Sequence, residues 1–418
     1  MPTKRMNQAL SLYAKYFQVF KTICVHWDSY KKKFRCIPLS SREVWLWIFN
    51  VFIVVGLIGL GNTLLCMLRI FVFGTLHLPW LNTFAMIISV IFGTCAIGVT
   101  LALILYGEDF VEGWNHLDNL ESRIVINDCH GHNKAKPKPI DFPGIATTYW
   151  VKILATYPII LIPSSIFLNL DIYYYYIREF KNYFPTKYQA FFVTLATIFV
   201  RFPLISVSII ESCRLLPLLY ILFASALQNG NVFLRKLVKQ AEANTSNVRL
   251  LREMQDSVKF YQTHGIICAM LAPFQECCTA VQFAVGLLSS IIFISATLRT
   301  YNVLPFLFYM FFPSAAVIVI IVIALMIPIA QGVNDMSKKF IRVWLAKIRV
   351  CEARGTRNFL RRVVRSLRPQ ALYVGIFGFR LFAITRSNKV TYYDAIMMYT
   401  MNTMMGVPQK IFENMFHA

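Results

Sequence analysis

Charged residues are scarce in this chain of 418 residues, because Asp, Glu, Lys and Arg together make up 15% of it. Globular proteins usually carry about a quarter. Ala, Val, Ile, Leu, Met, Phe, Trp, Tyr and Cys together make up 57% of the chain, which includes 35 Phe and 20 Tyr residues. A soluble domain has too little interior to bury so much apolar surface. The composition therefore excludes a soluble protein and predicts one that crosses the lipid bilayer several times.

The sequence also lacks the motifs of catalysis and cofactor binding. It contains no Walker lysine, no nucleophile elbow and no paired His-Glu metal motif. The grouping Asp128-Cys129-His130-Gly131-His132 matches no common zinc spacing. We therefore predict that the protein is not an enzyme and binds neither a metal nor a cofactor.

Acidic residues number 20 against 42 basic ones, which gives a net charge of +22. Such an excess of positive charge suggests nucleic-acid binding until the positions of the charges are considered.

Seven stretches are apolar and long enough to cross the roughly 30 Å of hydrocarbon in a bilayer. They are residues 45–67, 80–106, 149–170, 190–226, 266–297, 304–330 and 390–407. We expect segment 371–388, which contains Arg380 and Arg386, to be a short interfacial or re-entrant piece before the seventh span.

The orientation follows from the loops. Segments 1–44, 107–148, 227–262 and 331–370 carry 30 of the 42 Lys and Arg residues and fall on one side of the membrane. The positive-inside rule places that side, and the N-terminus, in the cytoplasm. Seven crossings then put the C-terminus outside. The basic excess faces anionic lipid, and nucleic acid is not an expected partner.

The spans divide the chain into four parts. These are a cytoplasmic N-terminal segment (1–44), a six-helix transmembrane bundle (45–330), cytoplasmic basic helices with the interfacial segment (331–389), and a seventh helix with a short outer tail (390–418). Apolar residues repeat at helical spacing beyond the second span, from Phe110 to Ile124, and again from Leu360 to Leu367. These amphipathic extensions either lie on the membrane surface or pack into a helical layer that joins subunits.

The C-terminal region carries a resemblance. The sequence VRSLRPQALYVGIFGFRLFAITRSNKVTYYDAIMMYTMNTMM combines a basic helix, a stop at Leu367-Arg368-Pro369, a stretch of Gly and Phe, and Thr391-Tyr392 before the last helix. It resembles the last part of the insect chemoreceptor superfamily, the odorant and gustatory receptors. The gustatory Thr-Tyr-x5-Gln-Phe signature does not fit after Thr391, and the odorant ending rich in Ser and Tyr is replaced. The comparison leans slightly to the gustatory branch.

The resemblance implies an all-α membrane protein of the plasma membrane of chemosensory neurons. It implies a non-selective cation channel opened by a small tastant or odorant and built as a homo- or hetero-tetramer of related subunits. Two other classes stay open. A G-protein-coupled-type receptor needs its N-terminus outside, and no Asp-Arg-Tyr or Asn-Pro-x-x-Tyr stands at the expected places. A small-molecule transporter is the second, although no internal repeat is visible.

The resemblance places the ligand in the outer half of the bundle. Aromatic and polar residues at that depth are Trp80, Phe84, Ile87, Tyr157, Ser164, Phe167, Phe192, Arg201, Phe202, Tyr309 and Phe312. Arg201 is the one charge among them, and a charge at mid-depth of a span needs a cavity or a partner. With no carboxylate nearby in these stretches, we predict a neutral or weakly anionic ligand. The aromatic segment 171–188 is either an interfacial girdle or a lid over the ligand entrance.

The resemblance also implies that the seventh helices line a shared pore. Asp394, Met397, Met401 and then Met404 or Met405 recur at helical spacing. The same stripe could instead pack against the subunit's own bundle. In a four-fold assembly Asp394 would form a ring of negative charge, and the methionines above it would form an apolar gate.

Overall fold

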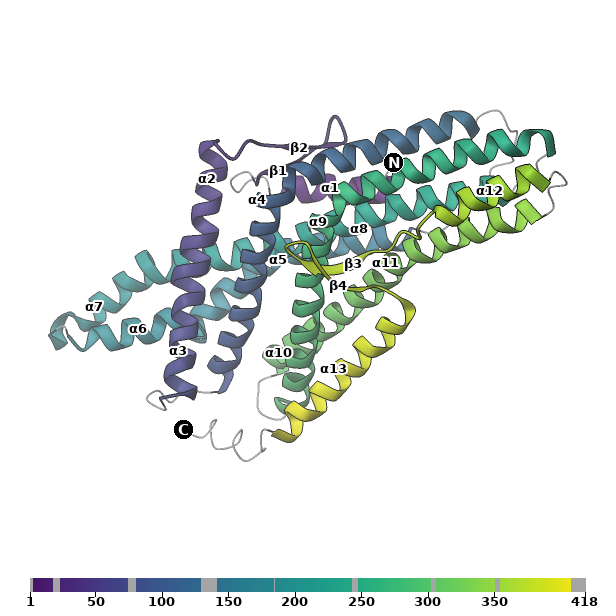
Figure 1. Cartoon of the computed structure of the whole chain (residues 1–418). Coiled ribbons are helices and arrows are strands. Elements are labelled where there is room, and N and C mark those ends of the chain that lie inside the picture. The colour runs from purple at the N-terminus through teal and green to yellow at the C-terminus, as the bar shows by residue number, and fades with distance from the viewer. Residues whose placement is uncertain are drawn as a thin grey trace.

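The computed structural model of the chain describes residues 3–17, 23–73, 80–128, 141–183, 185–242, 247–301, 306–349 and 354–406. The chain is mostly helical (Figure 1). Its helices and strands are α1 (Lys4–Phe17), β1 (Val25–Asp28), β2 (Lys33–Cys36), α2 (Arg42–Phe49), η1 (Asn50–Gly61), α3 (Asn62–Phe71), α4 (Trp80–Asp128), α5 (Phe142–Phe167), α6 (Ile172–Lys181), α7 (Thr186–Ala196), η2 (Thr197–Arg201), α8 (Phe202–Glu242), α9 (Asn247–Arg299), α10 (Phe306–Tyr309), α11 (Phe311–Arg349), α12 (Arg354–Ser366), β3 (Tyr373–Ile376), β4 (Phe379–Ala383) and α13 (Arg386–Gly406).

Within the described residues, six continuous helical stretches are long and apolar enough to cross a membrane. Each one contains most of one of the first six predicted spans, so several apolar spans are confirmed. The seventh predicted span forms α13, which is not among the six because its charged residues and its Thr, Tyr and Asn residues make it too polar. Seven crossings and the orientation of the termini stay predictions.

The spans at residues 80–106, 190–226, 266–297 and 304–330 continue well beyond the length that a bilayer needs. Helices α4, α8, α9 and α11 run on side by side and are joined by α12 (Figure 1). Phe110 and Trp114 of α4 are buried in the layer that these helices form. Tyr261 of α9 stacks on Phe340 of α11 with ring centroids 4.8 Å apart. The amphipathic extensions therefore pack on one another within the chain, and their role in joining subunits stays a prediction.

Helix α12 confirms the predicted basic amphipathic helix, with Leu360 and Val364 buried and arginines on its outer side. The linker after α12 is fixed to the long helices. The Tyr261 hydroxyl donates to the Arg368 carbonyl at 2.8 Å, and the backbone N–H of Gln370 donates to Ser337 Oγ at 2.7 Å. These bonds join the chain that leads into α13 to both α9 and α11.

The expectation of an all-α fold was wrong in two places, because two β-hairpins interrupt the helices. Segment 371–388, expected to be interfacial or re-entrant, contains the antiparallel pair β3–β4. Its two-residue turn consists of Phe377 and Gly378 at φ of 49° and 86°, values that fit the right-handed twist of a hairpin. Arg380 of β4 then binds buried Glu276 of α9 at 2.7 Å. The hairpin thus anchors the start of α13.

The topology gives a first testable prediction. We expect the sequon at Asn244, which lies outside the described residues, to stay unglycosylated because it falls in a predicted cytoplasmic loop. An epitope after residue 418 should be reachable by antibody in intact cells, whereas an epitope before residue 1 should need permeabilised ones. A glycan on Asn244 would overturn the orientation and the seven-span assignment together.

Candidate ligand-binding site

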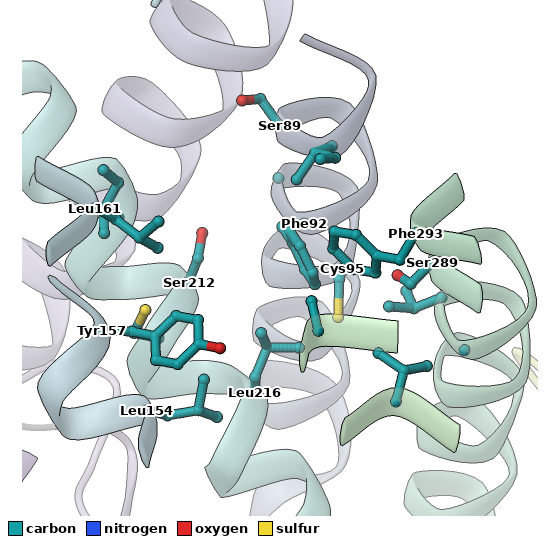
Figure 2. Close-up of a pocket in the computed structure, with 18 of the residues that line it drawn as sticks. Ser89, Phe92, Cys95, Leu154, Tyr157, Leu161, Ser212, Leu216, Ser289 and Phe293 are labelled. Carbon is teal, nitrogen blue, oxygen red and sulfur yellow. The ribbon is translucent and has the colours of Figure 1, made fainter. Parts of the chain in front are cut away.

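A cavity of about 400 Å³ lies between the apolar helices. Its walls come from η1, α4, α5, α8, α9 and α11, and the start of α6 contributes Ile172 and Tyr173. Figure 2 shows Phe92 of α4 beside Phe293 of α9, and Tyr157 of α5 directed into the space between α5 and α8. The volume lies in the range of small-molecule sites.

The lining is mainly apolar with a few polar groups. Ser212 and Ser289 present hydroxyl groups from α8 and α9, on different walls (Figure 2). Tyr157 and Gln282 add further groups that can donate or accept a hydrogen bond. Within the described residues, Asp171 is the one charged side chain in the lining. Such a surface suits a small, largely apolar molecule that a few hydrogen bonds orient.

Asp171 is held by Arg201. The Arg201 side chain is buried, and its Nε and Nη2 atoms donate to Asp171 Oδ2 at 2.8 and 2.6 Å. Nη2 also lies 3.0 Å from the Ile166 carbonyl and from Asn169 Oδ1. The guanidinium lies 5.2 Å from the centre of the Tyr174 ring. The expectation that no carboxylate lies near Arg201 was therefore wrong. Its partner Asp171 lies 30 positions earlier in the chain, outside the stretches that were considered.

Local sequence explains this cluster. Helix α5 ends at Phe167, and Asn169 adopts φ of 52°, a left-handed conformation that Asn tolerates better than most residues. Asp171 then caps α6 by accepting a hydrogen bond from the Tyr174 amide at 3.0 Å. Arg201 ends the π-helical turn η2. The widened turn is a feature that helices often place at functional sites.

Helix α13 reaches the cavity through Tyr392. This side chain is part of the lining, and its hydroxyl donates to the Phe283 carbonyl of α9 at 2.8 Å. Its ring packs edge-on against Phe283 with centroids 4.9 Å apart. Gly286 makes room for it, because a Cβ atom there would lie 2.9 Å from the Tyr392 hydroxyl. A ligand in the cavity can therefore touch the same helix that carries the methionine stripe.

Eleven residues were predicted to bind ligand from their expected depth in the membrane. Among them, Tyr157 alone lines this cavity. Phe84 and Phe312 pack on each other at 6.0 Å in a buried cluster that adjoins the cavity through Phe293. Phe167 and Phe202 are exposed on the single chain, and Ser164 donates to its own helix at the Ile160 carbonyl. Ile87, Phe192 and Tyr309 are also absent from the lining, Arg201 stands behind Asp171, and the side chain of Trp80 lies outside the described residues.

The sequence argument missed two walls. On α8 the lining residues recur every three or four positions from Ser208 through Ser212 and Leu216 to Tyr220, a spacing that marks one helix face. On α9, Ser289 and Phe293 follow the same rule. The recurrence of Ser at 208 and 212 was the available signal. It was overlooked because these positions lie below the depth at which the site was expected.

The proposed pore stripe lies on the outer face of α13. Met397, Met401 and Met405 are exposed on the single chain, with Met401 60% exposed, and Asp394 is exposed too. Ile396 and Thr400 on the opposite face are buried. Met404 differs, because it is half-buried and its sulfur accepts from Arg299 Nε at 3.3 Å. Met397, Met401 and Met405 therefore do not pack against the subunit's own bundle, whereas Met404 does.

Comparison with solved structures shows that the fold is similar to that of an insect olfactory receptor. The olfactory receptor OR5 from Machilis hrabei in complex with eugenol superposes with a TM-score of 0.56 at 12% sequence identity, covering 96% of this chain and 98% of that one. The structure of the same receptor described without eugenol gives 0.54, again at 12% identity, with 95% and 97% covered. No family model and no curated protein matches by sequence. The fold class is that of an insect olfactory receptor.

Proposed function

We propose that the protein is a chemosensory receptor that works as a ligand-gated, non-selective cation channel. The observation that carries the proposal is the cavity, whose lining includes Tyr392 of α13. A ligand opens a channel by binding the open state more tightly than the closed one. A ligand in contact with Tyr392 is placed to favour one position of α13 over another. The similar receptor from Machilis hrabei was solved with eugenol, which supports a small-molecule ligand here.

The pore in this proposal needs four copies of the chain, either identical or related. The exposed methionines and Asp394 of α13 would face a shared axis, with residues 390–418 as pore helix and outer tail. The supporting fact is that a row of exposed apolar side chains on one face usually marks an interaction surface or a membrane contact. Residues 331–389 then form the cytoplasmic part that positions α13, residues 45–330 form the ligand-binding bundle, and residues 1–44 lie in the cytoplasm.

The proposed site of action is the plasma membrane of chemosensory neurons. The similar structures belong to an olfactory receptor, whereas the slight lean to the gustatory branch rests on the C-terminal sequence alone. Either branch predicts current on exposure to ligand. A G-protein-coupled-type receptor would instead require an outer N-terminus, and a transporter would show uptake of the ligand.

The test is to express the chain alone and record current during application of a panel of tastants and odorants that includes eugenol. For any active compound, Ser212→Phe should abolish the response, because the new ring occupies space between α5 and α8 that the ligand needs. Val207→Phe places the same ring on the same helix outside the lining and should leave the response nearly unchanged. Equal responses from both variants would show that this cavity is not the ligand site.

A further inference from the structure

The wall of the cavity near α6 contains a buried ion pair that the function proposed above does not need. Asp171 lines the cavity, and Arg201 stands behind it, with side chains 9% and 5% exposed. A carboxylate or guanidinium buried alone is very costly, so each one depends on the other. Both charges are also bound to the backbone, since Asp171 caps α6 and Arg201 binds the end of α5.

The pairing decides what charge a ligand meets. Asp171 Oδ2 accepts two hydrogen bonds from Arg201, and Oδ1 accepts the Tyr174 amide. The carboxylate thus accepts three hydrogen bonds, and its charge is compensated inside the wall. Within the described residues no other charged side chain lines the cavity. A ligand with a formal charge would lose its hydration and find no counter-charge in return.

We propose that the Arg201–Asp171 pair sets the charge selectivity of this cavity by masking an anionic subsite, so that the site accepts uncharged molecules and rejects ions of either sign. The inference rests on the proposed function, because it concerns the same ligand site. It also makes Asp171 a specificity residue that touches the ligand, and Arg201 a positioning residue that acts through it. Removal of Arg201 would turn Asp171 into an unpaired acceptor for an ammonium group.

Three probes with one ring and different charge test the inference. They are 2-phenylethanol, 2-phenylethylamine and phenylacetate at pH 7, and binding to the purified full chain is measured from the shift of its thermal unfolding midpoint. Wild-type protein should bind the alcohol more tightly than either ion. In Arg201→Met the affinity for the amine relative to the alcohol should rise by about 10- to 100-fold, the range for a hydrogen bond to a charged group.

Two further variants separate charge from folding. Asp171→Asn retains a residue that caps a helix well and leaves Arg201 without its carboxylate, so relative affinity should rise for phenylacetate. The double variant Arg201→Met with Asp171→Asn restores a neutral wall and should restore the preference for the alcohol. The matched control is Arg69→Met. It breaks an ion pair with Glu179 of the same helix α6, at 3.2 Å on the surface, and should leave selectivity unchanged.

The outcomes distinguish a failure of the charge-selectivity inference from a failure of the proposed ligand site. If wild-type protein binds the alcohol but neither Arg201→Met nor Asp171→Asn gains the matching ion, the pair does not set selectivity and the ligand site stands. A wild-type preference for the amine or for phenylacetate overturns the inference in the same way. If wild-type protein binds none of the three probes, the ligand site itself is contradicted. A gain of the amine in Arg201→Met that the double variant reverses supports the inference.

Discussion

Current in the absence of ligand is the expected result of replacing Met401 or Met405 with Ser. Both side chains are exposed on the outer face of α13, and in a four-fold assembly they would form an apolar constriction that excludes water when closed. A Ser hydroxyl in the constriction keeps water there and removes most of the barrier to ion flow. We expect the resting current to rise at least about tenfold, which a modest shift of the open–closed equilibrium produces. Whole-cell recording without ligand, normalised to surface expression, measures it.

Met404→Ser is the matched control on the same helix. Met404 is half-buried and contacts Arg299, so its replacement should change resting current little if the pore faces Met401. Asp394→Asn should lower cation conductance or alter divalent permeability while ligand sensitivity stays nearly intact, because the substitution removes a ring of charge at the pore mouth. The stripe does not line a pore if neither Met401→Ser nor Met405→Ser raises the resting current and Asp394→Asn leaves the conductance unchanged.

Much of the helical architecture could be predicted from periodicity. The repeat from Phe110 onward predicted that the second span continues as an amphipathic helix, and Phe110 and Trp114 on its apolar face are buried. The hairpin β3–β4 was missed although YVGIFGFRLFA alternates β-forming residues around a Phe-Gly turn. Its apolar composition was read as contact with the membrane. A short apolar run fits several structures by sequence alone, and the antiparallel partner decides among them.

The cavity was harder to predict for a physical reason. Membrane helices are apolar on all sides, so no pattern separates the face toward lipid from the faces toward a neighbour or a cavity. Depth alone selected Phe167, which is exposed, together with Tyr157, which lines the cavity. The partner of Arg201 was equally hidden, because Asp171 precedes it by a helix and a loop. Contacts between distant segments have to come from the fold.

Tyr392 is the residue of α13 that lines the cavity, and we expect its replacement to have a large effect on activation. Its ring and hydroxyl bind Phe283 of α9, so α13 can move relative to α9 only if these contacts rearrange. A ligand beside the ring changes the free energy of that rearrangement, which is what coupling between a site and a gate requires. We expect Tyr392→Ala to raise the ligand concentration for half-activation about 10- to 100-fold, within the usual range of coupling energies.

The measurement that isolates coupling compares binding with current in the same variants. Tyr392→Phe loses the hydrogen bond to Phe283 and keeps the ring, so it should show a smaller shift, about 5-fold. Tyr393→Phe removes a neighbouring hydroxyl outside the lining and serves as the control. If Tyr392 couples the cavity to the gate, the maximal ligand-evoked current of Tyr392→Ala should fall more than its binding affinity does. Equal losses of affinity and current would make Tyr392 a ligand contact alone, and the link between cavity and pore would then have to pass through another residue of α9 or α11.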